Sequence, residues 1–513
     1  MDTKALRQKI LDLAIRGKLV PQDPNDEPAS VLLERIREKK RQMVKEGKLK
    51  AKDIKNDTVI FKGDDNLHYE KFPDGSVKCI EEEIPFELPE GWEWARLRDF
   101  VSFVGGSQPA KSTFEYIETP DNIRLIQIRD YKSDKYKTFI PREKARRFCS
   151  KSDVMIGRYG PPLFQILRGL EGAYNVALMK AVADPVIMIN DYLYYLLQDG
   201  ALLKMLESLS DRTCGQDGIN MFELNQYIVG IPPIDEQERI ARYLIDALPL
   251  ADKLSTLKDD LSELLSQTKS KILDLAIKGR LVPQDPNDEP VSVLLERIKK
   301  EKEELIKSGK LKRDKKESVI FKGDDNSYYE KVGEDIRCID EEVPFELPDS
   351  WEYIRLKFAW ELVSGRDLSP SEYSSEQSGI PYITGASNFE NGQVSLFRWT
   401  SVPQVITYKG DLLLTCKGTI GEIALNNFGE AHIARQIMAI RNKYDLNVDF
   451  LALCIEYSMS KIKQAAKGLI PGISREDILG LIIPIPPAEQ QIEIVRYVHI
   501  YRNKLNSILL SLM

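Results

Sequence analysis

Apolar residues in the middle of the chain follow a helical spacing. Between Leu250 and Leu264, leucines recur at alternating intervals of four and three residues, and Ile272 and Leu275 continue the row. Such a row lies along one side of an α-helix and is typical of helices that pack in pairs. The sequence therefore predicts a long central helix over residues 235–280, and we expect Pro249 to kink it.

The two ends of the chain repeat the two halves of this helix. The motif KILDLAI begins at Lys9 and again at Lys271, so residues 1–18 match the tail of the central helix, while residues 488–513 match its head. Because an exposed row of leucines is a liability in water, we expect both terminal helices to pack along the central one and complete a closed frame. The alternative is that each packs only on its neighbouring domain. The apolar residues assigned to this helix frame are Leu6, Ile10, Leu13, Leu250, Leu254, Leu257, Leu261, Leu264, Ile272, Leu275, Leu505, Ile508 and Leu512.

Other segments also occur twice. LVPQDPNDEP at 19–28 returns unchanged at 281–290, and VIFKGDDN at 59–66 returns at 319–326. GIPPIDEQERIARYL, beginning at Gly230, is echoed by PIPPAEQQIEIVRYV, beginning at Pro484. The chain therefore contains an internal repeat, and we expect its two halves to share one structural plan.

Two regions between these segments, 91–234 and 350–487, are much less alike. In each, a first half with β-type alternation is followed by a helical pattern. Duplication followed by drift would not explain why the connecting segments stayed nearly identical; two different binding domains on one symmetric frame would. We predict an α+β fold, with two globular domains separated by long antiparallel, coiled-coil-like helices in a pseudo-two-fold, circularly closed repeat.

Charge is distributed unevenly along the chain, whose net charge is −7. Residues 53–90 contain four Lys and eleven Asp or Glu, and residues 314–349 contain five Lys or Arg and twelve Asp or Glu, a net of −7 in each segment. Negative charge repels the phosphates of DNA, so these segments are poor candidates for DNA binding. We expect the regions 19–90 and 281–349 to be acidic linkers that dock a partner protein.

A basic stretch from Arg124 to Arg168 has twelve Lys or Arg, four acidic residues and interleaved aromatic residues. This composition is typical of a surface that neutralises DNA phosphates, although a solvated surface is the alternative. Base reading in the major groove uses Arg for guanine and Asn or Gln for adenine. The candidate DNA-binding residues of the first domain are Lys132, Lys135, Lys137, Arg142, Arg146, Arg147, Arg158, Tyr159, Gln165, Arg168, Tyr174, Asn175 and Gln216.

The second domain is nearly neutral, so its signal for DNA binding is weaker. Glycines in the segment TCKGTIG permit close approach of a backbone, and two further loops carry polar side chains. Its candidate DNA-binding residues are Asn388, Arg398, Lys417, Thr419, Arg435 and Gln436.

Catalytic motifs are absent from the sequence. It has neither the phosphate-binding GxxxxGK[ST] pattern nor a GxGxxG between strand and helix. The six cysteines include no CxxC pair, and the three histidines are scattered, so we expect no catalytic residue and no metal site. The N-terminus has no apolar signal-peptide core and no apolar run approaches ~20 residues, so a cytoplasmic protein without a membrane span is expected.

The segments LPEGWEWARL at 88–97, GDLLLTCKGTIGEIAL at 410–425 and IPPIDEQERIARYL at 231–244 resemble the specificity subunits of type I restriction-modification enzymes. The resemblance covers the whole chain and implies that each domain is a target-recognition domain for one half of a bipartite, asymmetric DNA sequence. It also implies that the paired helices set the spacer between the two halves. A two-domain interaction scaffold that binds only proteins is the alternative.

The resemblance further implies the partners of this chain. They are double-stranded DNA, two methyltransferase (modification) subunits and restriction/translocase subunits. S-adenosylmethionine, ATP and Mg²⁺ would belong to those subunits, and this chain would bind no cofactor and catalyse nothing. The assembled complex would be an adenine-specific DNA methyltransferase and a type I endonuclease.

Overall fold

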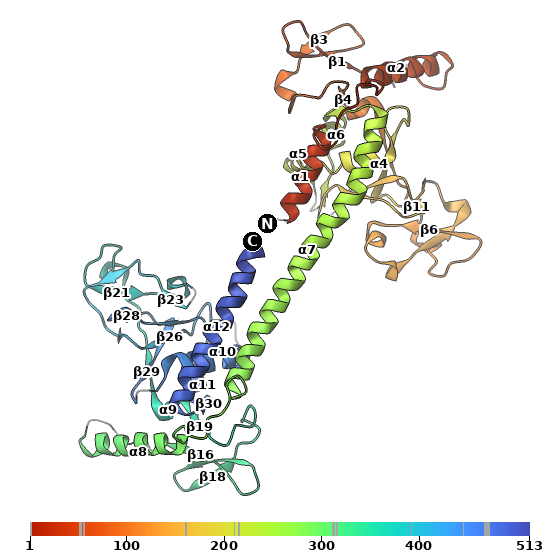
Figure 1. The fold of residues 1–513 in the computed structure, drawn as a ribbon. Coiled ribbons are helices and arrows are strands. Elements are labelled where there is room, and N and C mark those ends of the chain that lie inside the picture. The colour runs from red at the N-terminus through yellow and green to blue at the C-terminus, as the bar shows by residue number, and fades with distance from the viewer. Residues whose placement is uncertain are drawn as a thin grey trace. The chain divides into compact units, whose positions relative to one another are not determined.

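The computed structural model describes residues 3–50, 54, 57–159, 162–209, 211–213, 216–309, 313, 317–390, 392–444, 446–465 and 472–512. The chain divides into two compact units, Met1–Asp259 and Asp260–Met513. The two units contain similar, but not identical, successions of elements (Figure 1).

The first unit begins with two helices and a small sheet, continues into a domain of strands followed by helices, and ends in the long helix α7. Its elements are α1 (Thr3–Ile15), α2 (Ala29–Lys45), β1 (Val59–Lys62), β2 (His68–Lys71), β3 (Val77–Cys79), β4 (Glu93–Arg96), α3 (Leu97–Phe100), β5 (Val101–Gly105), β6 (Asn122–Ile126), β7 (Phe139–Pro141), β8 (Phe148–Cys149), β9 (Val154–Gly157), β10 (Gln165–Leu167), β11 (Gly172–Tyr174), β12 (Leu178–Ala183), α4 (Asn190–Leu196), α5 (Gly200–Ser208), β13 (Asp211–Thr213), β14 (Gln216–Gly218), α6 (Met221–Gln226), β15 (Ile228–Ile231) and the first half of α7 (Ile234–Ile277).

The second unit follows a similar order from the second half of α7 onward, with the strand pair β22-β23 added and the helix α10 in place of α4 and α5. Its elements are α8 (Val291–Lys307), β16 (Ser318–Lys322), β17 (Tyr328–Val332), β18 (Asp335–Cys338), β19 (Glu352–Arg355), α9 (Leu356–Ala359), β20 (Trp360–Ser364), β21 (Ile380–Ile383), β22 (Phe389–Glu390), β23 (Gln393–Val394), β24 (Trp399–Thr400), β25 (Ile406–Thr407), β26 (Leu412–Thr415), β27 (Ile423–Leu425), β28 (Ala431–Ile433), β29 (Ile437–Asn442), α10 (Val448–Ala465), α11 (Arg475–Leu479), β30 (Ile482–Ile485) and α12 (Ala488–Leu512).

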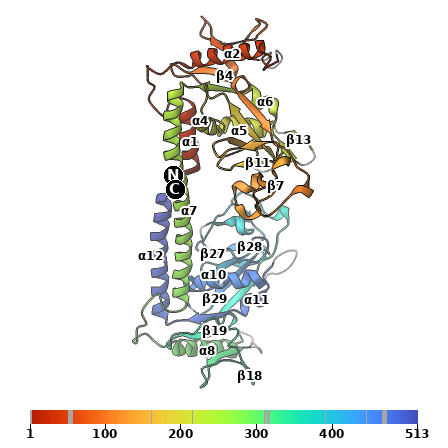
Figure 2. The ribbon, with the colours of Figure 1, turned by 90° about the vertical axis from the view of Figure 1, so that its right-hand side faces the viewer.

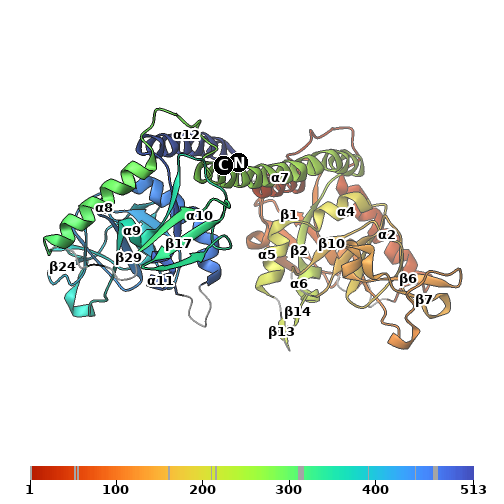
Figure 3. The same ribbon diagram turned by 90° about the horizontal axis from the view of Figure 1, so that it is seen from below.

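Each domain is built on two four-stranded sheets of the same topology. In the first unit the strand orders are β10-β9-β12-β5 and β7-β6-β11-β8; in the second they are β27-β26-β29-β20 and β24-β21-β28-β25. The pairs β6·β11 and β21·β28 are parallel, whereas the other strand pairs of these sheets are antiparallel. Within each unit the sheets lie to one side of the helix pair that contains α7 (Figure 3). The prediction of an α+β fold on a duplicated plan is confirmed.

The main core of each domain forms where one sheet packs on the helices that follow it. In the first unit Ile156 of β9 and Leu193 of α4 are fully buried, and in the second Leu414 of β26 and Ile455 of α10 are fully buried. These strands are buried on both faces, and they read as continuous apolar runs.

Helix α7 runs through Pro249 as one helix of 44 residues, which starts 15 residues before that proline. In the first unit α1 lies beside it, and Thr3 Oγ1 donates to Ser255 Oγ at 2.9 Å. In the second unit α12 lies beside it, and Lys269 Nζ donates to Asn506 Oδ1 at 2.6 Å (Figures 1 and 2). Both terminal helices therefore pack along the central helix, as predicted.

Four leucines of the predicted row on α7 are exposed and not buried. Leu250, Leu254, Leu257 and Leu264 have exposed fractions of 67%, 38%, 55% and 58%. The buried apolar positions of the helix are instead Ile240, Ala241, Leu244, Leu248, Ala251, Leu265, Leu273, Ala276 and Ile277. The helix carries two apolar rows with the same helical period. The domain core buries the row that includes Leu244 and Leu248, and not the predicted leucine row.

The remaining frame residues are mostly half-buried. Ile508 is exposed, and the side chain of Leu512 lies outside the described part of the chain. The half-buried ones are Leu6, Ile10, Leu13, Leu261, Ile272, Leu275 and Leu505.

The acidic regions expected to be linkers contain folded elements. In the first unit, region 19–90 forms α2 and the antiparallel sheet β1-β2-β3; in the second, region 281–349 forms α8 and the sheet β16-β17-β18. Helix α2 lies beyond the end of α7 at which Ile234 stands (Figures 1 and 2). Each sheet is joined to its domain through a buried ion pair.

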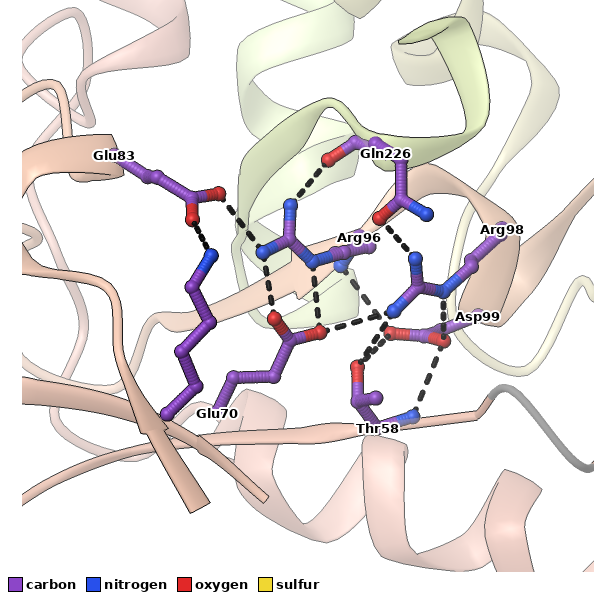
Figure 4. A network of polar contacts seen from close by, with 8 residues as sticks. Thr58, Glu70, Glu83, Arg96, Arg98, Asp99 and Gln226 are labelled. Atoms are coloured by element: carbon purple, nitrogen blue, oxygen red, sulfur yellow. Dashed lines mark hydrogen bonds and ion pairs between the residues drawn. The ribbon is translucent and has the colours of Figure 1, made fainter. Parts of the chain in front are cut away.

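Arg96 of β4 makes this pair in the first unit (Figure 4). Its guanidinium donates to both carboxylate oxygens of Glu70 at 2.7 and 2.6 Å, to Glu83 at 2.9 Å and to the carbonyl oxygen of Gln226 at 2.6 Å. Arg96 and Glu70 are only 4% and 1% exposed. A buried charge is tolerated only when its hydrogen-bonding groups are satisfied, and this geometry satisfies them.

Arg355 repeats the arrangement in the second unit. It donates to both oxygens of Glu330 at 3.0 and 2.8 Å, to Glu342 at 2.6 Å and to the carbonyl oxygen of Gly480 at 2.6 Å. The Arg355 guanidinium lowers the pKa of Glu330 to about 2 although burial opposes this.

We predict that Glu330→Gln destabilises the second unit at neutral pH by about 1.5–3 kcal/mol, because the buried Arg355 loses the carboxylate that binds two of its nitrogens and keeps only the pairing with Glu342. The folded pKa of Glu330 lies below its unfolded value. Its stabilisation is therefore present above about pH 4.5 and is lost as the pH falls toward 2. Denaturant unfolding of the full chain at pH 7, 5 and 3 should show the difference between variant and parent shrinking with acid.

The matched control is Glu334→Gln, an exposed residue on the turn between β17 and β18, which should unfold like the parent protein. An equal loss of stability at all three pH values would contradict this role for the ion pair.

Candidate nucleic-acid interface

Three loops meet at one end of the sheet β10-β9-β12-β5 in the first unit, and three meet at the same end of β27-β26-β29-β20 in the second. In the first unit the amide nitrogen of Arg158 donates to the carbonyl of Ala177 at 2.9 Å, that of Gly106 to Leu178 at 3.0 Å, and that of Ser107 to Tyr174 at 3.1 Å. We call residues 106–109, 158–159 and 175–177 the first loop cluster. Main-chain hydrogen bonds hold it together.

The same bonds recur in the second unit. The amide of Cys416 donates to Gln436 at 2.7 Å, that of Gly365 to Ile437 at 3.0 Å, and that of Arg366 to Ile433 at 2.9 Å. Residues 365–368, 416–419 and 434–436 form the second loop cluster. The two clusters therefore share a backbone and differ in side chains.

Gly106 and Gly365 are required by the close approach of these loops. A Cβ atom on Gly106 would lie 1.9 Å from the carbonyl oxygen of Asn175, and one on Gly365 would lie 2.1 Å from that of Ala434. Neither distance is possible for a real side chain, so only glycine fits. Neither glycine was predicted as a site residue, although an alignment of VGGSQ at 104–108 with VSGRD at 363–367 pairs them.

The first loop cluster presents a half-buried cation, an exposed aromatic ring and an exposed amide. The Arg158 guanidinium carbon lies 5.3 Å from the centre of the Tyr159 ring, and Tyr159 is 37% exposed. Gln108, which was not predicted, is exposed beside them, whereas Asn175 is half-buried and uses its side-chain oxygen to accept from the amide of Ala177. A guanidinium, a flat ring and an amide are the groups that contact base edges and stack on bases or sugars.

The second loop cluster is richer in positive charge. Lys417 and Thr419 are exposed as predicted for contact residues, and so is Arg435, which is paired with Asp367 at 2.7 Å. Next to them lie two exposed cations that were not predicted, Arg366 and Arg475, of which Arg475 donates to Ser364 at 2.7 Å. The sequence signal for Arg366 was its position directly after Gly365.

A buried histidine positions Arg366. The Nε2 atom of His432 donates to the carbonyl oxygen of Arg366 at 2.8 Å, and the amide of Val405 donates to Nδ1 at 3.1 Å. His432 is fully buried, and burial lowers its pKa, so the ring stays neutral with one donor and one acceptor nitrogen. Gln436 is half-buried, and its amide nitrogen faces Asp367 and the carbonyl of Thr384.

The basic stretch of the first domain covers turns around the sheet β7-β6-β11-β8. Lys137 is half-buried and pairs with Asp134 at 2.9 Å. Five other candidates of this stretch are exposed: Lys132, Lys135, Arg142, Arg146 and Arg147. These cations stand on several turns rather than on one strand, as expected for groups that contact a phosphate backbone.

The structure gives other candidates a structural role. Tyr174 is 1% exposed and donates to the carbonyl of Val104 at 3.1 Å. Asn388 is fully buried, where it accepts from Thr384 and donates to Ser395. Direct DNA contact by these two residues was a wrong prediction, because their polar groups bond the protein's own loops.

Four further candidates lie outside the two loop clusters. Arg168 pairs with Asp191 at 2.7 Å and lies over Tyr194, and Arg398 lies over Tyr373. Gln165 donates to the carbonyl of Pro162 at 3.1 Å. The side chain of Gln216 lies outside the described residues.

Groups suited to catalysis are not gathered here. Burial raises the pKa of the Cys416 thiol, which keeps it protonated. Among the residues that the structure describes, no three His, Cys, Asp or Glu side chains are grouped to hold a metal ion. In the same part of the chain, no helix has the length and apolar character to cross a membrane.

We predict that Gly106→Ala separates the loops of the first cluster, because the new methyl group would collide with the Asn175 carbonyl. Overpacking of this kind costs about 1–3 kcal/mol. Hydrogen-exchange mass spectrometry should show faster exchange at the amides of 106–107 and 178 in the variant. Gly105→Ala is the matched control, since its Cβ would lie 3.7 Å from Arg158. Protection in Gly106→Ala equal to that of the parent would refute the role of this glycine.

Comparison with known proteins agrees with this geometry. The family model described as "Type I restriction modification DNA specificity domain" matches residues 89–259 and 348–510, more than half of the chain. The chain is 26% identical to the type I restriction enzyme EcoEI specificity subunit of Escherichia coli, over 96% of this chain and 88% of that protein. It is 32% identical to the EcoAI specificity subunit of Escherichia coli, over 71% of this chain and 63% of that protein.

A solved structure described as the structural basis of complex assembly and conformational transition of the type I R-M system has a similar fold. It is 18% identical, with a TM-score of 0.50, over 83% of this chain and 94% of that chain. The two matched regions contain the two loop clusters. The chain therefore belongs to the family of type I restriction-modification DNA specificity subunits, with one specificity domain in each unit.

Proposed function

We propose that each loop cluster reads one half of a bipartite DNA target, and that the chain thereby sets the sequence specificity of a type I restriction-modification complex. One observation carries this proposal: the same main-chain bonds build both clusters, yet the side chains on them differ. Two domains with one backbone and different contact groups suit an asymmetric target.

The side chains suggest how each half is bound. In the second unit Arg366, Lys417 and Arg435 supply the positive charge that DNA phosphates require, and a guanidinium can also bond the O6 and N7 atoms of guanine. In the first unit Arg158 and Gln108 are the groups suited to base edges. The cations on the turns around β6 and β7 fix the register on the backbone.

Helix α7 suits the role of a spacer. It contains 44 residues, which at ~1.5 Å per residue corresponds to about 66 Å of helix. One turn of B-DNA measures ~34 Å, so a helix on this scale is compatible with two half-sites separated by unread base pairs.

Catalysis is assigned to partners. The chain acts as a non-catalytic subunit that binds DNA in the cytoplasm and positions methyltransferase and restriction/translocase subunits on it. The methyltransferase flips out the target adenine, so this chain need only place it. The family resemblance implies that S-adenosylmethionine, ATP and Mg²⁺ bind to those subunits.

The direct test of this function is an exchange of domains. Replacing residues 92–230 by the equivalent region of another specificity subunit should change one half of the methylated sequence and leave the other half intact. Methylome sequencing of cells that carry the chimera and its methyltransferase measures this. The unmodified chain in the same cells is the control, and a change in both halves would show that the domains do not read independently.

A charge variant tests the second loop cluster. The double variant Arg366→Gln and Lys417→Gln should lower the slope of log K against log salt for DNA binding by about 1.8, since each lost phosphate contact removes about 0.9. The slope is measured by titrating the complex with methyltransferase subunits onto target DNA between low and moderate salt.

Lys409→Gln is the matched control for this variant. Lys409 is exposed on the turn before β26, whereas Lys417 follows the end of that strand. An unchanged slope in the double variant, or an equal loss in the control, would remove the cluster from the DNA interface.

A further inference from the structure

The acidic sheet β1-β2-β3 has an apolar outer face. Its register pairs Val59 with Lys71 and Lys71 with Val77, and it pairs Phe61 with Tyr69 and Tyr69 with Cys79. Because side chains alternate along a strand, these six project from one face of the sheet. The intervening residues Ile60 and Glu70 are buried against the domain.

The second unit carries the same face on β16-β17-β18. Val319, Lys331 and Ile336 form one cross-strand row, and Phe321, Tyr329 and Cys338 form the other. Only the change from Val77 to Ile336 distinguishes the two sets of six residues, and both of these residues are aliphatic. We call these two surfaces the outer faces.

Aromatic packing on the two outer faces is also the same. The rings of Phe61 and Tyr69 stack at 5.9 Å, and those of Phe321 and Tyr329 stack at 5.8 Å. Each tyrosine hydroxyl donates to an aspartate, Asp65 at 2.6 Å or Asp325 at 2.8 Å. Phe61 and Phe321 nevertheless remain 39% and 38% exposed, and Val77 and Ile336 are 52% and 56% exposed.

A small pocket beside each outer face repeats as well. In the first unit it is lined by Ile60, Phe61, Leu88 and Trp92, among others; in the second the corresponding lining residues include Ile320, Phe321, Leu347 and Trp351. The pocket lies between the first strand of the sheet and the segment that leads into the domain. It offers each outer face a recess for one apolar side chain.

The Arg96 network makes the first outer face a rigid part of its unit (Figure 4). Glu70 stands on β2 between two outer-face residues, Tyr69 and Lys71, and its carboxylate is held by Arg96 and also by Arg98 at 3.0 Å. In the second unit Arg355 binds the carboxylate of Glu330, which lies on β17 between the outer-face residues Tyr329 and Lys331. A binding surface mounted this way loses little conformational entropy when a partner docks.

Identity of exposed side chains between the units indicates one common ligand. The loop clusters share a backbone and have different side chains, whereas the outer faces share both. DNA is a poor ligand for them, since residues 53–90 and 314–349 each carry a net charge of −7 and would repel phosphates. A protein surface rich in Lys and Arg complements this charge.

We propose that the outer faces are two equivalent docking sites for two copies of one partner protein, which presents a basic surface and inserts an apolar side chain beside Phe61 or Phe321. The inference deepens the proposed function and rests on it, since it says where a subunit of the complex is held. Each specificity domain thereby carries its own copy of the partner.

The test counts the partner subunits bound to the full chain. The probes are the purified methyltransferase subunit and the purified restriction subunit, and native mass spectrometry gives the stoichiometry with the parent chain, Phe61→Ser, Phe321→Ser and the double variant. For one of the two probes, the number bound should fall from two to one in either single variant and to none in the double variant.

Two further variants separate recognition from folding. Phe222→Ser changes an exposed phenylalanine of α6 (68% exposed) and should still bind two copies. Asp64→Lys with Asp324→Lys reverses charge on exposed turns of the two sheets, and it should weaken binding of the same probe at low salt at least tenfold. Unfolding curves should show that the charge variant is as stable as the parent.

The outcomes distinguish this inference from the proposed function. If the double phenylalanine variant and the charge variant both keep two copies of each probe, the outer faces are not docking sites, although the chain still works as a specificity subunit. Loss of both copies in a single variant would overturn the independence of the two sites. A parent chain that binds neither probe would overturn the proposed function itself, and the inference with it.

Discussion

Main-chain hydrogen bonds hold each loop cluster together, and the rest of the functional surface depends on this. The bonds from Arg158, Gly106 and Ser107 in the first unit are reproduced by Cys416, Gly365 and Arg366 in the second. A main-chain bond does not depend on the side chain that its residue carries. The side chains at these positions therefore changed between the units without loss of the fold, except at the glycines, where any Cβ would collide with a carbonyl oxygen. This freedom is what a surface needs when it must present different groups to different sequences.

The acidic sheets, by contrast, are attached to their domains by side-chain bonds. Side chains join them to their domains, since Arg96 bonds Glu70 and Glu83, and Arg355 bonds Glu330 and Glu342. Loss of either member of the Arg96–Glu70 or Arg355–Glu330 pair leaves a buried charge with only part of its partners, so these positions cannot drift independently. The need for this attachment explains why Ile60 and Glu70 of the first sheet recur as Ile320 and Glu330 in the second. It does not explain the identity of the exposed outer faces, for which a shared ligand is the physical reason.

The sequence predicted the repeat, the central helix, the pairing of the terminal helices with it and the α+β domains, because repeats and helical periods are local patterns. It failed where long-range packing decides. Leu250 and Leu257 have the spacing of a buried seam but are exposed, since the domain core covers the row that includes Leu244 and Leu248. The acidic regions read as linkers because their strands are short and highly charged, and their folding depends on Arg96 and Arg355 from distant strands. Tyr174 and Asn388 have the side chains of base readers, and only the structure shows that the loops use them internally.

Within each unit, the loop cluster and the outer face are held by different bonds, so each can change without the other. A substitution at Lys417 or Arg435 alters groups on the exposed loop cluster, whereas the outer face is fixed through β17 and β19 by the Arg355–Glu330 pair. Arg337, Glu342 and the carbonyl of Gly480 also bond the two members of this pair, and none of them belongs to the second loop cluster. Changes that alter DNA reading therefore leave the mounting of the acidic sheet intact. A chain built this way acquires new target sequences while it keeps the surface that we assign to its partner.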